Sequence, residues 1–351
     1  QRPNLQIWAL SATIGNVLEA TDHALGIDAS RRIVINSSPR RKTTIRSILP
    51  DSIDGFPWAG HLGLRMYEQL VSNLDPRIST LLFTNTRNQS ERWHQCLRYA
   101  CPEMENSLAL HHSAIDRTER EAIEENMKYG SIRWVVCTSS LDLGIDFQPV
   151  EKVVQIGSPK NIARLLQRAG RSAHCPGGES QVLFMPTNAL ELLELSALRR
   201  GLENELIEQR KPPHKPLDVL LQHLTTLACG PGFNPDETLE TIRKTASFAS
   251  LTNEEWQWCL LFLEKGGVCL NAYSRYRKLN WNAAEKLYMI SDQSLARLHK
   301  FNIGTITSAP SICVKFSRGA ILGHVEENFI SQLNPKDVFF FAGRQLELNK
   351  I

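Results

Sequence analysis

The stretch from residue 152 to residue 171, KVVQIGSPKNIARLLQRAGR, decides the fold class. Its first five residues form a mostly apolar run of the length of a buried strand. Beyond that run, apolar residues recur at the i, i+3, i+4 and i+7 spacing of a helix with one apolar face: Ile162, Leu165, Leu166 and Ala169. We expect Ser158 to cap this helix and Pro159 to occupy its first position. The stretch therefore predicts a buried strand followed by an amphipathic helix.

The same alternation continues along the chain on both sides of this stretch. The predicted strands are Arg32–Asn36, Thr80–Thr84, Leu108–His111, Ile132–Cys137, Lys152–Ile156 and Gln181–Met185. Helical patterns lie between them, for example over Leu62–Leu74 and Ser90–Tyr99. A further helix has the capping-box spacing at Asp116 and Glu119, and Gly130 suits its end. Alternating strands and helices predict an α/β domain built on a parallel sheet with crossover helices.

The length and composition limit the class of protein. A chain of 351 residues is longer than one hydrophobic core normally serves, so we expect two or three domains. Hydrophobic residues make up 42% of the chain and charged residues 22%, which is typical of a globular protein. No apolar run approaches the ~18 residues of a membrane span. The net charge of +3 excludes a polyanion-binding tail, so a nucleic-acid surface requires local clustering of charge.

The cysteine and histidine patterns argue against a metal site. The eight cysteines form no C-x-x-C pair, which excludes the usual zinc ribbon and redox dithiol motifs. Cys137 lies in an apolar run, where a free thiol behaves as a small buried hydrophobe. Free cysteines of this kind indicate a reducing cytoplasm. His111 and His112 make a poor ligand pair, because neighbouring residues of a strand face opposite sides. We therefore predict no metal ligands in this chain.

The composition changes at residues 211–216, KPPHKP, where we place a boundary between domains. An apolar helix is predicted over Leu217–Cys229, and a second helix runs from a capping box at Thr252 to a glycine pair at Gly266. The extended stretch Val268–Trp281 follows. Helices followed by a β-ribbon predict a winged helix.

Strand patterns mark both ends of the chain. From Ser311 onward we expect a strand, a turn at residues 318–319 and a second strand, with Asp337–Leu348 as a further strand. This pattern predicts the start of a β-rich, barrel-like domain. At the other end, Leu5–Leu10 is predicted to be a buried strand, which we interpret as the last piece of a domain whose bulk is missing. We therefore divide the chain into residues 1–25, 26–210, 211–305 and 306–351.

The helix that follows residue 160 carries a row of polar residues opposite its apolar face: Arg164, Gln167, Arg168 and Arg171. Between Lys152 and Gly178 the sequence contains no Asp or Glu. Exposed helix faces usually mix charges of both signs, so this row predicts a polyphosphate partner. The alternative is an ordinary solvated helix face.

Two further segments follow predicted strands and therefore lie at the carboxyl edge of the sheet, where ligands of open α/β sheets bind. Residues 138–146, TSSLDLGID, offer hydroxyl groups to phosphate oxygens, close backbone approach at Gly144 and a ribose acceptor at Asp146. The second segment can hold a phosphodiester backbone with Thr84, Asn85, Thr86 and Arg87. The alternatives are an ordinary turn in the first segment and, in the second, helix capping by Asn88 or Ser90.

Taken in order, these segments resemble the later motifs of a superfamily 2 helicase. Motifs III, IV, V and VI correspond to Ser11–Thr13, Leu82–Arg87, Thr138–Asp146 and Gln167–Arg171. The longer strings HHS at 111–113, TSSLDLGID at 138–146 and QIGSP at 155–159 resemble the Lhr (large helicase-related) group of DEXH helicases. NIGTI at 302–306, GHVEENFI at 323–330 and FAGR at 341–344 are similar to its ligase-associated DNA damage response branch.

The resemblance implies two RecA-like domains with ATP between them, and a winged helix and barrel-containing domain that grip single-stranded DNA. Arg168 and Arg171 would be the catalytic arginines facing the ATP phosphates. Nucleotide contacts are also implied for Gly144, Asp146 and Gln167. DNA contacts are implied for Thr84, Thr86, Arg87, Thr138, Ser139, Arg164 and Ile306. Coupling of hydrolysis to strand movement would fall to Ser11, Ala12 and Thr13. One departure is His174, which stands where the helicase pattern has an arginine and cannot replace its guanidinium.

The family pattern has a P-loop and a DEXH box before motif III, and this sequence contains no G-x-x-x-x-G-K-S/T string. We expect the main residues for ATP and Mg²⁺ to lie in a missing N-terminal part, and this chain alone to be inactive. The complete protein is predicted to be an ATP-dependent DNA helicase that moves 3′ to 5′ in DNA repair. Its implied partners are single-stranded DNA, DNA with a 3′ tail and repair proteins such as a DNA ligase, with no membrane. The alternatives are a non-catalytic nucleic-acid-binding or regulatory protein and an RNA helicase.

Overall fold

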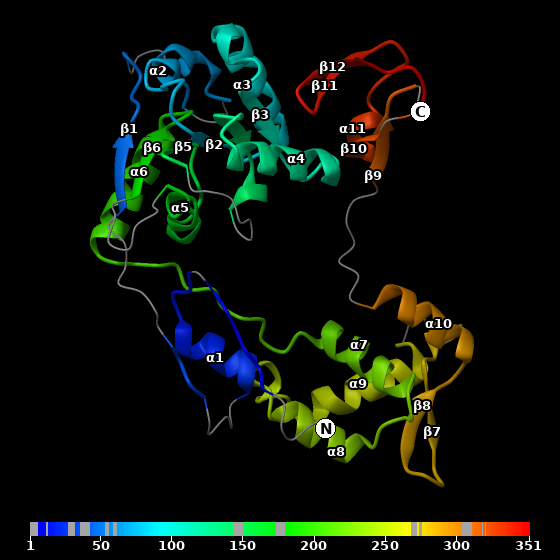
Figure 1. Ribbon diagram of the computed structural model, residues 1–351. Coiled ribbons are helices and arrows are strands. Elements are labelled where there is room, and N and C mark those ends of the chain that lie inside the picture. Colours follow the sequence, from blue (N-terminus) through cyan, green and yellow to red (C-terminus); the bar gives the residue numbers. More distant parts are fainter. Residues whose placement is uncertain are drawn as a thin grey trace. The chain divides into compact units, whose positions relative to one another are not determined.

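The computed structural model describes residues 6–11, 13–26, 32–35, 43–52, 56–58, 62–142, 150–172, 180–267, 272–273, 276–303, 311–317, 319 and 321–351. The chain forms two compact units (Figure 1), one of residues 1–36 with 209–307 and one of residues 37–208 with 308–351. Each unit has its own hydrophobic core. None of the helices formed by the described residues is long and apolar enough to cross a membrane.

The larger unit contains a six-stranded sheet. In chain order, its strands are Thr43–Ser47 (β1), Thr80–Phe83 (β2), Leu108–His111 (β3), Trp134–Cys137 (β4), Lys152–Ile156 (β5) and Ser180–Met185 (β6). Their order across the sheet is β1-β6-β5-β2-β4-β3, and all neighbours are parallel. All residues of β2, β3 and β4 are buried, as expected for a sheet covered on both faces. The predicted α/β fold with a parallel sheet is therefore confirmed.

Helices cover both faces of this sheet. One face packs against Tyr67–Val71 (α2) and Arg87–Ala100 (α3), through a core that includes Leu82 and Trp93. The other face packs against Arg117–Lys128 (α4), Ile162–Ala169 (α5) and Leu190–Glu203 (α6). The described residues of this part of the unit also form short 3₁₀ turns at Leu64–Met66 (η1), Pro102–Met104 (η2) and Ser139–Leu141 (η3). Neighbouring residues of β2 divide between the two cores, since Leu82 contributes to the first and Phe83 to the second.

The centre of the sheet brings three chain segments to one edge. Strand β2 lies between β5 and β4, and all three strands run in the same direction. The segments that follow them are residues 84–86, 138–142 and 157–161. The chain visits β3 and β4 on one side of β2 and then crosses to β5 on the other, so the connections diverge at this edge. Open α/β sheets bind ligands at such a point.

The smaller unit has the plan of a winged helix. Its helices are Val17–Leu25 (α1), Leu217–Ala228 (α7), Pro235–Arg243 (α8), Asn253–Lys265 (α9) and Gln293–Asn302 (α10), with a short turn at Ala246–Phe248 (η4). An antiparallel ribbon joins Leu279–Asn282 (β7) to Leu287–Ile290 (β8). Thr252 and Glu255 form the predicted capping box, and Gly266 ends α9 with a φ of +79°. The predicted winged helix is therefore confirmed.

Residues 311–351 form two antiparallel pairs within the larger unit. Ser311–Lys315 (β9) pairs with Ile321–Glu326 (β10), and Val338–Phe341 (β11) pairs with Arg344–Glu347 (β12); Glu327–Ile330 (α11) follows β10. The β-rich pattern is confirmed, but the single strand expected over Asp337–Leu348 is wrong. Ala342 and Gly343 have φ values of +52° and +72°, which turn the chain back on itself as a two-residue hairpin.

Two other predicted strands are wrong. Residues 6–10, from the run Leu5–Leu10, are irregular and exposed, with Trp8 81% and Leu10 91% accessible. Residues 32–35, from the run Arg32–Asn36, are also irregular. Leu5 and Asn36 themselves lie outside the described residues. A strand needs a hydrogen-bonded neighbour, and among the described residues neither run pairs with one, so apolar composition alone was insufficient.

The capping box predicted for α4 forms only in part. Asp116 caps the helix by accepting from the Thr118 amide at 2.9 Å. The Asp116 amide, which Glu119 was expected to bind, donates instead to the Leu322 carbonyl at 3.2 Å. The Glu119 carboxylate contacts Arg344 at 3.4 Å. A segment distant in sequence therefore takes the place of the local motif.

The stability of the larger unit should fall in mild acid because of His94. Burial lowers the pKa of this α3 imidazole from 6.5 to about 4, with Arg98 lowering it further and Glu91 opposing the shift. The unfolded chain then binds a proton more readily than the folded one, so stability present above pH 6.5 is lost as the pH falls towards 4. The expected loss from this group is about 2 kcal/mol at pH 5.

Urea titrations at pH 7 and pH 5 measure this dependence. His94→Gln should reduce the difference between the two pH values, whereas His214→Gln, at an exposed position of the other unit, should leave it unchanged. An undiminished difference in the His94 variant would show that burial of this imidazole is not the cause.

Candidate functional site

The helix that carries the arginine row begins later than the sequence indicates. Helix α5 starts at Ile162, and its cap is Asn161, whose side-chain oxygen accepts from the Arg164 amide at 2.7 Å. The predicted cap at Ser158 and start at Pro159 are therefore wrong. Lys160 has a φ of +72°, which no helix residue adopts, so the chain before residue 161 cannot continue the helix. The Ser158 hydroxyl instead accepts from the Lys160 amide at 3.1 Å.

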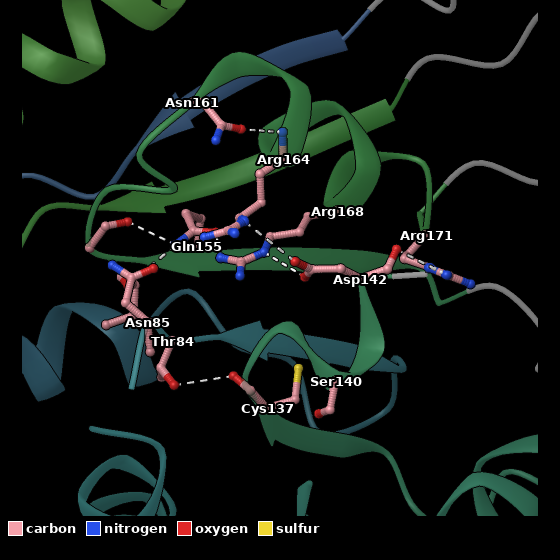
Figure 2. A network of polar contacts seen from close by, with 12 residues as sticks. Thr84, Asn85, Cys137, Ser140, Asp142, Gln155, Asn161, Arg164, Arg168 and Arg171 are labelled. Atoms are coloured by element: carbon pink, nitrogen blue, oxygen red, sulfur yellow. Dashed lines mark hydrogen bonds and ion pairs between the residues drawn. The ribbon is translucent and has the colours of Figure 1, made fainter. Parts of the chain in front are cut away.

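Asp142, which ends the turn after β4, contacts three arginines of the row (Figure 2). Its Oδ1 accepts from Arg168 Nε at 2.8 Å, and its Oδ2 lies 3.6 Å from Arg164 Nε. Its backbone carbonyl accepts from Arg171 Nη2 at 3.0 Å. The expectation that the row has no neutralising acid is therefore wrong, because the acid comes from outside the stretch that the sequence argument covered.

Arg168 is the most buried charge of this cluster. Its side chain is 1% exposed, and its Nη1 donates to Gln155 Oε1 of β5 at 2.6 Å. Gln155 Nε2 in turn donates to the Gly157 carbonyl at 2.8 Å. The guanidinium also lies over the Phe83 ring, 4.7 Å from its centroid. Arg168 is thus neutralised, hydrogen-bonded and stacked, and it fixes α5 to the ends of β2, β4 and β5.

Arg171 follows the C-terminal end of α5. Its side chain is half-buried, and Figure 2 shows it on the side of Asp142 away from Arg168. Burial lowers the pKa of its guanidinium and Asp142 opposes that shift; an arginine nevertheless stays protonated at neutral pH. Gln167, from the same row, is partly exposed. The cluster therefore presents one half-buried guanidinium beside a fully neutralised one.

The residues predicted from the loop after β2 have different environments. Thr84 is fully buried, and its hydroxyl lies 3.2 Å from the Cys137 carbonyl and 3.3 Å from that of Thr86. Thr86 is exposed and caps α3 by accepting from the Gln89 amide at 3.1 Å. The cap is therefore neither of the residues considered as alternatives, Asn88 and Ser90, and α3 begins at Arg87.

Arg87 is exposed at the start of α3. Its Nη2 donates to Ser113 Oγ at 3.2 Å, and its Nη1 lies 3.9 Å from Glu326 Oε1. These two partners come from the segment after β3 and from β10. Arg87, predicted to contact nucleic acid, therefore already contacts two side chains of its own unit.

The loop after β4 starts with a buried residue and continues with an exposed one. Thr138 is 8% exposed, and its amide donates to the His111 carbonyl at 3.3 Å, whereas Ser139 is exposed. Ser140 Oγ donates to the same His111 carbonyl at 3.1 Å and lies 2.8 Å from His111 Nδ1. Burial lowers the pKa of His111, and Glu124 opposes this. This network fixes the loop to the end of β3.

His111 and His112 face opposite sides of the sheet, as predicted. His111 Nε2 lies 3.0 Å from Glu124 of α4, and His112 Nε2 lies 3.0 Å from Glu91 of α3. Within the part of the chain that the structure describes, no three His, Cys, Asp or Glu side chains gather as a metal site.

Several predicted site residues fall outside this arrangement. Gly144, Asp146, Ile306 and Ala12 lie outside the described residues, as does His174. Ser11 is exposed and Thr13 partly so, and both belong to the smaller unit. Arg164 is the remaining member of the row, with 38% of its side chain exposed.

The sequence argument missed three residues that hold the site together: Phe83, Asp142 and Gln155. Asn85, which it named as a phosphodiester contact, joins two loops of the site. Asn85 Nδ2 donates to the Ser158 carbonyl at 2.7 Å, which joins the loops after β2 and β5. Asp142 stood in the quoted 138–146 string, and Gln155 in the quoted strand. Asp142 and Gln155 are buried polar residues near strand ends, a signal that an argument for exposed phosphate ligands does not use. Phe83 is apolar and carries no such signal.

The larger unit has a RecA-like parallel sheet with arginines at its carboxyl edge, and the smaller unit is a winged helix. These two folds in one chain are typical of the helicase class. Residues 64–175 match the family described as helicase conserved C-terminal domain, and residues 200–351 match the family described as large helicase-related protein, winged helix domain.

The chain is 31% identical over 347 residues to the ATP-dependent helicase Lhr-Core protein 2 of Thermococcus barophilus, covering 97% of this chain and 40% of that protein. It is 29% identical to the ATP-dependent helicase Lhr-Core of Methanocaldococcus jannaschii, covering 95% of this chain and 39% of that protein. The structure of Mycobacterium smegmatis helicase Lhr bound to ssDNA and AMP-PNP shares the fold, with a TM-score of 0.70 and 24% identity over 86% of this chain and 38% of that one.

The chain belongs to the Lhr-type helicase family, and the resemblance to the Lhr group stated from its motifs is confirmed. It spans 40% and 39% of the length of the two curated relatives.

Removing Asp142 should destabilise the larger unit strongly. Asp142→Ala leaves the buried Arg168 guanidinium without its anion, and breaking such a pair costs about 3–5 kcal/mol. Urea unfolding followed by circular dichroism measures the change. The matched control is Glu121→Ala, which removes the partner of exposed Arg117 in α4 and should cost less than ~1 kcal/mol. Equal losses in the two variants would contradict the central place given to Asp142.

Proposed function

We propose that this chain supplies the second RecA-like domain and the winged helix of an ATP-dependent DNA helicase. The observation that carries the proposal is the arginine cluster, in which Asp142 and Gln155 neutralise and bond Arg168 while Arg171 stands beside it at the sheet edge. The relatives in Thermococcus and Methanocaldococcus are named ATP-dependent helicases, and the Mycobacterium structure contains AMP-PNP and ssDNA. These names support an ATP-driven motor acting on DNA.

In this proposal the two arginines predicted to be catalytic have different tasks, and only Arg171 touches the nucleotide. Arg171 contacts the phosphates of ATP and stabilises the charge that develops on the transferred phosphoryl group. Arg168 acts through Arg171 as a positioning residue, because its own guanidinium is 1% exposed and is used by Asp142 and Gln155. Gln167, Gly144 and Asp146 complete the nucleotide contacts of this half.

The remaining parts of the ATP site come from the first RecA-like domain of the longer protein. In this proposal the P-loop and DEXH box of that domain would hold Mg²⁺, which would neutralise charge on the phosphates. We propose that the chain alone does not turn over ATP, because the P-loop and DEXH box belong to that other domain.

The same edge of the sheet offers a track for a single strand. Thr86, Arg87 and Ser139 are exposed there, and their hydroxyl and guanidinium groups are suited to phosphate oxygens. Thr84 and Thr138, in the same loops, are buried, and in this proposal they hold the loops that carry these residues. Arg164 extends the track in this proposal, and a DNA contact by Ile306 is proposed from the family resemblance alone. We further propose that the complete protein moves 3′ to 5′ on a 3′-tailed substrate and belongs to the ligase-associated branch. It would act in DNA repair alongside a DNA ligase, in the cytoplasm.

Arg171→Ala in the complete protein should lower kcat for ATP by roughly 10³–10⁵. That corresponds to about 4–7 kcal/mol of transition-state stabilisation, whereas a solvated arginine contributes less than ~1 kcal/mol. Steady-state kinetics with saturating single-stranded DNA measure kcat, and a melting curve checks the fold. Arg117→Ala, an exposed arginine of α4, is the control and should retain wild-type turnover. A folded Arg171 variant with most of its wild-type kcat would refute the assignment.

The chain should bind single-stranded DNA in a strongly salt-dependent manner. Each phosphate that the protein neutralises contributes about −0.7 to the slope of log K against log salt concentration. Arg87→Ala should therefore make the slope shallower by about 0.7, while Arg117→Ala should not change it. Fluorescence anisotropy between low and moderate salt gives both slopes, and identical slopes for wild type and Arg87→Ala would remove Arg87 from the track.

A further inference from the structure

Glu91 of α3 joins two parts of the chain that are far apart in sequence. Its side chain is buried, yet its Oε1 accepts from the Ala342 amide at 2.6 Å and its Oε2 from the Gly343 amide at 2.8 Å. Oε1 also lies 3.0 Å from His112 Nε2. A carboxylate is costly to bury unless its oxygens are bonded, so the β11–β12 turn is what makes this position of Glu91 tolerable.

The strand β10 makes a second contact of a different kind. The His324 amide donates to the Ala114 carbonyl at 2.9 Å, and Ile115 and Gly323 form an antiparallel bridge. A Cβ at residue 323 would lie 1.9 Å from the Ala114 oxygen, so only glycine permits this approach. The backbone of the segment 112–116 therefore pairs with β10, a strand from the C-terminal part of the chain.

Side chains close the same interface. Ala114 packs into a small core with Leu322, Val325, Phe339 and Phe341. The Arg92 guanidinium of α3 lies 5.8 Å from the centre of the Phe340 ring. These contacts are apolar and cationic–aromatic, so the interface does not depend on Glu91 alone.

The interface also reaches the nucleic-acid edge. Ser113 lies in the segment that pairs with β10, and Glu326 is the last residue of β10. Both contact the Arg87 guanidinium, at 3.2 Å and 3.9 Å. The C-terminal segment thus supplies one partner of Arg87, Glu326, and pairs with the segment that carries the other, Ser113.

We infer that residues 311–351 stabilise the RecA-like domain and position Arg87 for nucleic acid. Their attachment depends on the bonds from Glu91 to the β11–β12 turn, which we call the latch. The winged-helix family match extends over residues 200–351. Residues 311–351 of that match nevertheless pack against the RecA-like domain. The positioning of Arg87 rests on the proposed function, whereas the latch itself does not.

Hydrogen exchange of the full 351-residue chain tests the latch without DNA or ATP. Glu91→Ala and, separately, Gly323→Ala should speed exchange of the amides in 338–347 and 112–116 by at least about tenfold. Peptides from α7 and α9 should be unchanged. Glu105→Ala, which removes the exposed partner of Arg98, is the control and should change neither region. Gly323→Ala leaves the α3 core intact, so it decides the question if Glu91→Ala fails to fold. Unchanged protection of 338–347 and 112–116 in Gly323→Ala overturns the latch.

Salt-dependent anisotropy with single-stranded DNA tests the positioning of Arg87. Gly323→Ala should make the salt slope shallower by about 0.7, and adding Arg87→Ala to it should change the slope no further. Full additivity of the two variants, or a wild-type slope in Gly323→Ala, overturns the positioning. Absence of DNA binding by the wild-type chain refutes the track and with it the positioning, while the exchange experiment still decides on the latch.

Discussion

The arrangement of the site depends on the buried ion pair between Arg168 and Asp142. A guanidinium that is 1% exposed destabilises a protein unless an anion and further acceptors meet it. Asp142 and Gln155 supply them from the turn after β4 and from β5, so a single side chain ties α5 to two strand ends. The Asp142 carbonyl then accepts from Arg171, and the position of that arginine follows from the same pair.

The regular elements could be predicted because their signals are local. The strands β3 and β5 have the predicted bounds, and α9 begins and ends at the capping box and glycine that the sequence shows. The run Arg32–Asn36 has strand composition as well, but pairing requires a neighbour that no local pattern reveals. The hairpin turn at Gly343 was missed for a related reason, since its amide is held by Glu91, 252 residues away in sequence.

The site could be predicted as a set of segments but not as a network. Its arginines follow from helical spacing, and the three loops follow from strand ends that meet at one edge. Their charge balance did not follow, because folding brings Asp142 to Arg168 from outside the stretch whose acids were counted. The contact with Asp142 also changes the role expected for Arg168. From the sequence, Arg168 and Arg171 were equivalent.

A structure of the complete protein with single-stranded DNA and a non-hydrolysable ATP analogue tests the central claim most directly. The account predicts that Arg171 lies within hydrogen-bonding distance of the terminal phosphate while Arg168 keeps its bonds to Asp142 and Gln155. A structure in which Arg168 leaves Asp142 to bind the phosphate, or in which Arg171 remains distant from the nucleotide, would contradict it.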